Sequence, residues 1–123
     1  DKIKREKILS IKGRKFTIKN YYEGITRFDF SDLCNKNVGA EDYIKIADIC
    51  KYILIENLPN FDDNNSNQQQ RFIALIDIFY EKKVSLAISS VSNLNKLTSA
   101  VSLSEPFKRT LSRLYELTSS SNI

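Results

Sequence analysis

The apolar positions between residues 68 and 90 follow two periods, first helical and then extended. Four residues recur at the i, i+3, i+4, i+7 spacing that defines one face of a helix: Phe72, Leu75, Ile76 and Phe79. After the charged turn at residues 81–83, the short apolar run Val84–Ile88 predicts a buried strand. A helix that leads directly into a buried strand is the repeating unit of α/β domains.

The N-terminal segment predicts antiparallel strands. Residues 7–11 and 15–19 are two strand candidates joined at Gly13, where a tight hairpin needs a positive φ. After a second turn at residues 20–24, residues 25–30 alternate, and one side of this strand is formed by Thr26, Phe28 and Phe30. We therefore expect the chain to begin with an antiparallel β-meander.

The middle of the chain predicts a helix followed by a second buried strand. Ser31 or Asp32 is the expected cap of a short helical turn. A longer helix is predicted from Ala40, and its apolar face consists of Tyr43, Ile46, Ala47 and Cys50. Residues 52–55 form the strand, and Pro59 ends regular pairing.

Two connecting segments carry weaker signals. The asparagine-rich residues 62–67 bury little, so we expect a mobile polar loop. Residues 92–97 are expected to form one helical turn with Leu94 and Leu97 facing inward, whereas residues 98–104 carry no clear pattern.

The C-terminal segment predicts a strong amphipathic helix. Ser104 is a candidate cap, Pro106 suits the first turn, and the apolar face comprises Phe107, Leu111, Leu114 and Tyr115. The expected fold class is α/β: an N-terminal antiparallel β-meander, then helix–strand units forming a partly parallel sheet with the C-terminal helix packed on it. We expect residues 1–123 to be a single domain.

Composition places the chain among ordinary soluble proteins, with 41% hydrophobic and 28% charged residues. No apolar run approaches the roughly 20 residues of a membrane span, so no membrane span is expected. The chain begins with Asp and contains no Met. We therefore expect a fragment of a larger protein.

The net charge of +4 is concentrated in the first twenty residues, which carry eight lysines and arginines. Two interpretations remain open: a basic hairpin that engages nucleic acid or protein, and the solvated outer face of a hairpin, which we favour. The two cysteines, Cys34 and Cys50, have no histidine to complete a zinc set. They are interpreted as reduced structural thiols of a cytosolic-type protein.

A complete active site is missing from the sequence. The chain has three glycines, no phosphate loop and no histidine, which excludes a histidine-based triad. We therefore predict no catalytic residue and no metal site within these residues.

Arg109 and Arg113 are the first candidates for binding. They are i, i+4 neighbours on the last helix, where like charges repel, and an acidic or phosphate partner would relieve that repulsion. The alternative is a solvated helix face on which Glu116 pairs with Arg113.

Four other residues are candidates: Arg71, and three weaker ones, Glu56, Ser89 and Asp77. Glu56 and Ser89 follow the two buried strands, and ligands gather at the carboxyl ends of strands in open α/β sheets. The alternative is an exposed loop glutamate beside exposed serines. Arg71 lies near the start of the long helix, where its charge opposes the helix dipole and favours a specific partner. Arg71 and Asp77 border the apolar stripe, and a structural ion pair is favoured over catalysis.

Several short motifs occur in a fixed order along the chain: Gly13-Arg14, Phe28–Cys34, Asp42-Tyr43, Leu58-Pro59, Arg71-Phe72-Ile73 and Phe107–Glu116. In this order and spacing the chain, from about Ile8 to Leu117, resembles the C-terminal part of the AFG-type P-loop ATPases. This AAA-like family includes the bacterial cell division protein ZapE. The family usually has two arginines before the Phe-Ile of the long helix, and Gln70 replaces the first here.

The resemblance implies a full-length parent that binds and hydrolyses ATP with Mg²⁺ through motifs upstream of this chain, which would be inactive alone. It implies a link to bacterial cell division through the tubulin-like division ring, or to quality control of inner-membrane proteins in mitochondria. The implied location is the bacterial cytoplasm, including the division site, or the mitochondrion in a eukaryote.

The implied partners are the upstream ATPase domain, a division-ring or other client protein, and further copies of the protein; nucleic acid is not expected. Arg71, Arg109 and Arg113 become candidates to meet nucleotide phosphate or a neighbouring subunit. The alternative function is a non-enzymatic module that binds protein or nucleic acid through its basic N-terminal hairpin.

Overall fold

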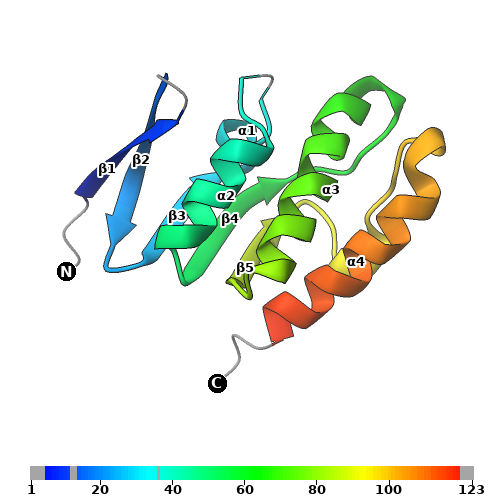
Figure 1. The fold of residues 1–123 in the computed structure, drawn as a ribbon. Coiled ribbons are helices and arrows are strands. Elements are labelled where there is room, and N and C mark those ends of the chain that lie inside the picture. Colours follow the sequence, from blue (N-terminus) through cyan, green and yellow to red (C-terminus); the bar gives the residue numbers. More distant parts are fainter. Residues whose placement is uncertain (1–4, 12–13, 36, 120–123) are drawn as a thin grey trace.

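The computed structural model describes residues 5–11, 14–35 and 37–119 (Figure 1). The strands are β1 (Arg5–Ile11), β2 (Arg14–Tyr22), β3 (Ile25–Asp29), β4 (Tyr52–Leu58) and β5 (Ser85–Ser90). The α-helices are α1 (Phe30–Leu33), α2 (Ala40–Ile49), α3 (Ser66–Glu81) and α4 (Ser104–Ser119). Three short 3₁₀ helices lie at Asp63–Asn65, Leu94–Lys96 and Val101–Leu103.

The five strands form one sheet in the order β1-β2-β3-β4-β5. The pairs β1–β2 and β2–β3 are antiparallel, and the pairs β3–β4 and β4–β5 are parallel. Each parallel pair is connected through helices, α1 and α2 for the first and α3 for the second. When successive right-handed crossovers add strands in the same direction along a sheet, their helices lie on the same face of that sheet. Figure 1 shows α2, α3 and α4 together on one face, which confirms the predicted α/β fold.

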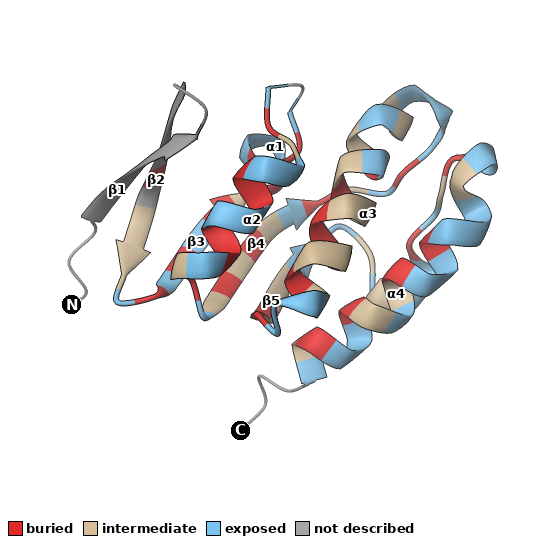
Figure 2. Cartoon of the chain, viewed as in Figure 1, coloured by how far each residue is buried: buried red, intermediate tan, exposed pale blue. Residues whose placement is uncertain are grey.

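All three parallel strands alternate between the two faces of the sheet, although the sequence predicts alternation only for residues 25–30. Thr26, Ile53 and Leu86 lie in register across β3, β4 and β5, and all three are buried under the helices. The next layer of the same face consists of Phe28, Ile55 and Ile88. The face of α3 is also confirmed, because Phe72, Leu75, Ile76 and Phe79 are fully buried (Figure 2).

The turn before β3 is tighter than predicted, because β2 continues through Tyr22. Glu23 and Gly24 both adopt positive φ, 49° and 87°, as the two central residues of a tight hairpin turn do. The Gly24 carbonyl accepts hydrogen bonds from the backbone N–H groups of Lys51 (2.7 Å) and Tyr52 (3.2 Å). The turn therefore fixes the meander to the start of β4. The predicted turn at Gly13 lies outside the described residues.

Four phenylalanine rings meet at the end of the sheet where the parallel strands finish. The ring centroid of Phe61 lies 5.7 Å from that of Phe30, 5.8 Å from that of Phe72 and 5.6 Å from that of Phe107. Phe30 and Phe72 are 5.9 Å apart. These rings come from α1, the β4–α3 connection, α3 and α4, so one cluster joins four segments of the chain.

The prediction of a mobile loop at residues 62–67 is wrong. A 3₁₀ turn occupies Asp63–Asn65, and α3 begins at Ser66. The Asp62 carboxylate accepts from the Asn64 N–H at 2.8 Å, and the Asn65 side-chain oxygen accepts from the Asp62 N–H at 2.8 Å. Polar side chains thus accept hydrogen bonds from backbone N–H groups of this segment, and these bonds order it without burying apolar surface.

Two predicted helix caps and one core position are also corrected. Asp29, rather than Ser31 or Asp32, caps α1, because its carboxylate accepts from the Ser31 N–H at 3.0 Å. The Ser104 hydroxyl donates to the Val101 carbonyl at 2.9 Å and so lies inside the helix instead of capping it. Tyr115 is exposed, whereas Phe107 and Leu114 are buried as predicted.

The connection to α4 is held by a buried polar side chain. Gln69 is fully buried, its side-chain NH₂ donates to the Ser99 hydroxyl at 2.7 Å, and its side-chain oxygen accepts from the Ala100 N–H at 2.9 Å. Leu97 is buried and Leu94 is half-buried, so the predicted inward-facing turn is confirmed.

We expect Phe61→Ala to lower the free energy of unfolding of the chain by about 3–5 kcal/mol, because it removes a buried ring with three aromatic neighbours. Urea denaturation measures the change. Val101→Ala, at an exposed position, is the control and should change it by less than about 0.5 kcal/mol. A loss for Phe61→Ala below about 1 kcal/mol would contradict a central role for this ring.

Candidate functional site

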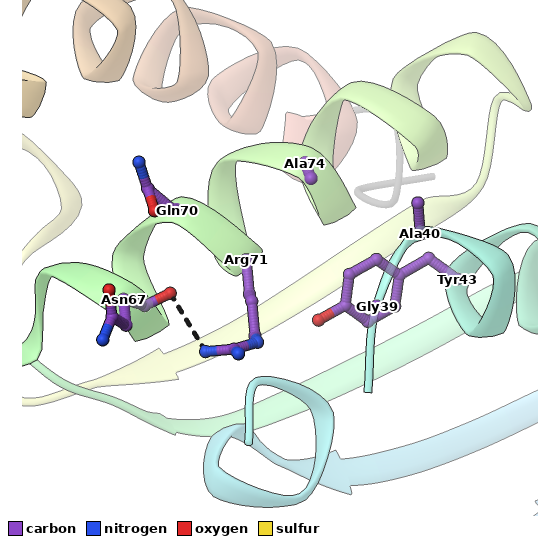
Figure 3. Close-up of a pocket in the computed structure, with 7 residues that line it drawn as sticks. All are labelled: Gly39, Ala40, Tyr43, Asn67, Gln70, Arg71 and Ala74. Atoms are coloured by element: carbon purple, nitrogen blue, oxygen red, sulfur yellow. Dashed lines mark hydrogen bonds between the residues drawn. The ribbon is translucent and has the colours of Figure 1, made fainter. Parts of the chain in front are cut away.

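Arg71 lies on α3 and points toward the start of α2 (Figure 3). Its guanidinium contributes to an open pocket of about 230 Å³, whose other lining residues are Gly39, Ala40, Tyr43, Asn67, Gln70 and Ala74. One guanidinium nitrogen, Nη1, donates to the Asn67 carbonyl at 3.4 Å. In Figure 3 the Gln70 side chain is directed away from Arg71. The pocket therefore presents a single arginine.

The charge of Arg71 has no ion-pair partner among the described residues. An adjoining pocket of about 330 Å³ is lined by Arg71 together with Glu41 and Asp42 at the first turn of α2. The Asp42 carboxylate is engaged there, because it accepts from the Gly39 N–H at 2.8 Å. Arg71 is therefore a partly exposed cation with donors available to an oxyanion.

Arg109, Arg113 and Asp77 come together between α3 and α4. Arg113 Nη1 lies 2.7 Å from Asp77 Oδ1, and Arg109 Nη2 lies 3.7 Å from Asp77 Oδ2. Arg113 is only 23% exposed, whereas Arg109 is 62% exposed. One carboxylate therefore offsets the repulsion between the two arginines, and it holds Arg113 more tightly than Arg109.

Tyr80 extends this network. The Arg113 guanidinium carbon lies 4.6 Å from the centre of the Tyr80 ring, and the Tyr80 hydroxyl donates to Glu116 at 2.9 Å. That hydrogen bond raises the pKa of Tyr80. The predicted pairing of Glu116 with Arg113 is thus replaced by a contact between Glu116 and Tyr80.

Glu56 and Ser89 lie elsewhere, near the carboxyl ends of β4 and β5. Glu56 accepts from Arg27 in a two-pronged ion pair, 3.0 Å to Nε and 3.2 Å to Nη2, which raises the pKa of Arg27. Ser89 is exposed, and neither Glu56 nor Ser89 contacts any of the three candidate arginines, Arg71, Arg109 and Arg113. Glu56 is therefore a strand residue in an ion pair, not a loop glutamate.

Sequence reasoning missed a polar group beside Glu56. The Asp29 carboxylate accepts from the Ser31 hydroxyl and from the Asn57 side chain, and these bonds lower the pKa of Asp29. Asn57 has φ of 65° at an irregularity in the pairing of β4 with β5. The alternation of β3 places Arg27 and Asp29 on one side of that strand. Their proximity to Glu56 follows only from the parallel register of β3 with β4.

The residues described here do not fit a complete nucleotide or Mg²⁺ site. In residues 5–11, 14–35 and 37–119, no three His, Cys, Asp or Glu side chains gather as a metal would require. The carboxylates of Asp29, Glu56 and Asp77 each already accept from groups of this chain. The site can contribute one arginine, Arg71, to the binding of an anion that other residues also contact.

Parallel strands connected through helices characterise α/β proteins, the class to which many nucleotide-binding enzymes belong. The sequence model of the AFG1-like ATPase family matches residues 1–123. The chain belongs to this family of AFG1-like ATPases.

Two relatives illustrate the match. "Lactation elevated protein 1 homolog B" of Danio rerio is 32% identical over 95 residues, which are 77% of this chain and 19% of that protein. "Cell division protein ZapE" of Escherichia coli K12 is 32% identical over 90 residues, 73% of this chain and 24% of that protein. The chain thus spans about a fifth to a quarter of the relatives it matches. No solved structure is significantly similar to it.

Within the described residues, the helices lack the length and apolar character needed to cross a bilayer. The side chains of the basic hairpin lie outside the described residues, so its binding to nucleic acid or protein stays a prediction.

We expect Cys34 and Cys50 to resist alkylation in the folded chain. Both are buried, and burial raises the pKa of each thiol to about 12. At pH 8 only about one thiol in 10⁴ is then ionised, against roughly a quarter of exposed thiols. Iodoacetamide labelling followed by mass spectrometry should be at least about 100-fold slower than in urea. Comparable rates with and without urea would contradict this.

We expect the ion pair between Asp77 and Arg113 to stabilise the packing of α4 on α3. A double-mutant cycle with Asp77→Ala and Arg113→Ala should give a coupling energy of about 1 kcal/mol, because both groups are partly buried. Urea denaturation measures it. The matched control is the highly exposed pair Lys108–Glu105, 3.0 Å apart on α4, which should show little coupling. Equal coupling in the two cycles would assign no special role to Asp77.

Proposed function

We propose that this chain is the C-terminal module of an ATP-hydrolysing, AAA-type protein, and that Arg71 is the residue through which it contacts an oxyanion. Other parts of the full-length protein would bind ATP and Mg²⁺, and this chain would be inactive alone. One observation carries the proposal: in a member of an ATPase family, Arg71 enters an open pocket without an ion-pair partner among the described residues.

The chemistry of arginine supports this role. Its planar guanidinium stays charged and can bind two oxygens of a phosphate or carboxylate at once. An arginine that reaches a phosphoryl group during transfer stabilises the charge that develops on it. The oxyanion at Arg71 has two candidate sources, a nucleotide phosphate and a carboxylate of a neighbouring subunit.

Arg109 and Arg113 are proposed for different roles. Arg109 is the second candidate for an oxyanion, because it is exposed and its contact with Asp77 is long at 3.7 Å. Arg113 already binds Asp77 at 2.7 Å and covers the Tyr80 ring. We assign it to the positioning of α4, which would keep Arg109 in place.

The wider role proposed for the full-length protein is in cell division or in quality control of membrane proteins. The name of the Escherichia coli relative supports the first. The client would be a division-ring or other protein, in the bacterial cytoplasm or the mitochondrion.

In the full-length protein, we expect Arg71→Ala to lower ATP turnover by at least about tenfold, because a cation that offsets phosphate charge would be lost. Arg71→Lys should restore only part of the rate, since lysine cannot bind two oxygens in a fork. A steady-state ATPase assay measures both. Lys108→Ala, which removes an exposed cation of α4, should leave turnover unchanged.

A second measurement distinguishes the two sources. Loss of nucleotide affinity in Arg71→Ala, with the oligomer intact in sedimentation, would assign the contact to phosphate. Weaker self-association with unchanged nucleotide affinity would assign it to a neighbouring subunit. Unchanged turnover, affinity and assembly would refute the role of Arg71.

A further inference from the structure

One face of the parallel sheet has no covering layer in the part of the chain that the structure describes. Figure 1 shows α2, α3 and α4 together in front of the sheet. The rings of Phe30 and Phe61 pack against Phe72 of α3, so α1 and the β4–α3 connection join the same layer. We call the opposite side of β2–β5 the open face; it carries Tyr22, Ile25, Arg27, Tyr52, Leu54 and Ala87.

The open face is largely apolar where the parallel strands begin, with Ser85 as a polar residue beside Tyr52. Tyr22, Ile25 and Tyr52 are register partners, so their side chains lie side by side on one face. Ile25 is 47% exposed. Leu54 follows at the centre of the sheet, on the middle strand of the three parallel strands, with Ala87 beside it. Apolar residues at such positions are typical of a sheet that is covered on both sides.

The open-face residues of β3, β4 and β5 carry no excess of positive charge, because the alternation of β3 places Asp29 there as well as Arg27. Arg27, the cation of this set, is paired with Glu56 of β4. The face therefore offers little attraction to a polyanion such as nucleic acid, whose binding depends on unpaired cations. Its chemistry favours an apolar protein surface.

We infer that the open face is the docking surface for the remainder of the same polypeptide, an inference that rests on the proposed role as a module of a larger ATPase. Parallel strands connected through helices, such as β3, β4 and β5 of this mixed sheet, usually belong to sheets that are covered on both faces. The relatives are four to five times longer than their matched segments, which are 19% and 24% of their lengths. A tethered partner also has a high effective concentration, which a second copy lacks.

Cysteine labelling of the full-length protein tests this directly. Ile25→Cys places a thiol on the open face, and Ile44→Cys places one on α2 at a similar exposure, 40%. We expect native labelling of Ile25→Cys to be at least about tenfold slower than that of Ile44→Cys, after each rate is normalised to the urea-unfolded protein. Peptide mass spectrometry reads each site separately, and Ala87→Cys provides a second open-face position.

Each outcome decides the inference. Slow labelling at positions 25 and 87, unchanged over a hundredfold dilution, supports docking within one polypeptide. Protection that disappears on dilution would assign the face to a second copy and overturn it. Labelling of Ile25→Cys at the rate of Ile44→Cys would also overturn it. The labelling measurement needs no nucleotide. It can therefore overturn the docking inference while Arg71→Ala still lowers ATP turnover. Equally, labelling can support docking while Arg71→Ala leaves ATP turnover unchanged.

Discussion

Contact among four phenylalanine rings is the interaction on which the helical layer depends. Phe61 lies in the connection after β4 and touches rings from α1, α3 and α4. These segments lie beyond the carboxyl ends of the parallel strands, where no strand pairing fixes the direction of the chain. The cluster supplies that constraint and also positions Arg71, the residue that precedes Phe72 on α3. With Phe72 in the core, successive residues of a helix diverge by about 100°, so Arg71 is directed outward to the pocket beside α2.

The elements with a regular period were predictable, and the single residues that hold them together were not. The face of α3 follows from its spacing, and the strand β3 follows from its alternation. Phe61 has no periodic neighbours, since Pro59, Asn60 and a polar turn surround it. The ring contacts of Phe61 form only when folding brings together rings that are distant in the sequence. In the same way, Asp29 and not Ser31 caps α1, because β3 ends at Asp29, one residue earlier than the alternation through Phe30 indicates, and the helix begins at Phe30.

The candidate site shows the same limit. Sequence reasoning selected Arg71, Arg109, Arg113 and Asp77, and all four are placed by the helices that it predicted. The sequence alone does not tell which arginines form ion pairs, because ion pairing with Asp77 depends on how α4 lies against α3. Arg71 and Asp77 are six residues apart on one helix, a rotation of about 240°, so they point in different directions. Asp77 turns to α4 and Arg71 to α2, which is why Arg71, unlike Arg109 and Arg113, has no ion-pair partner among the described residues.

The one-sided helical layer follows from the topology itself. Strands β3, β4 and β5 are neighbours in sequence order, and each crossover has the same hand and the same direction. Such a sheet can cover its second face only with a segment outside these two crossovers, and α4 instead packs beside α3 and β5. Meanwhile the central strand keeps Leu54 on that face, between Arg27 and Ala87. If the inferred docking holds, folding and assembly of this protein are linked, because residues that form the central strand, such as Leu54, also form the docking surface.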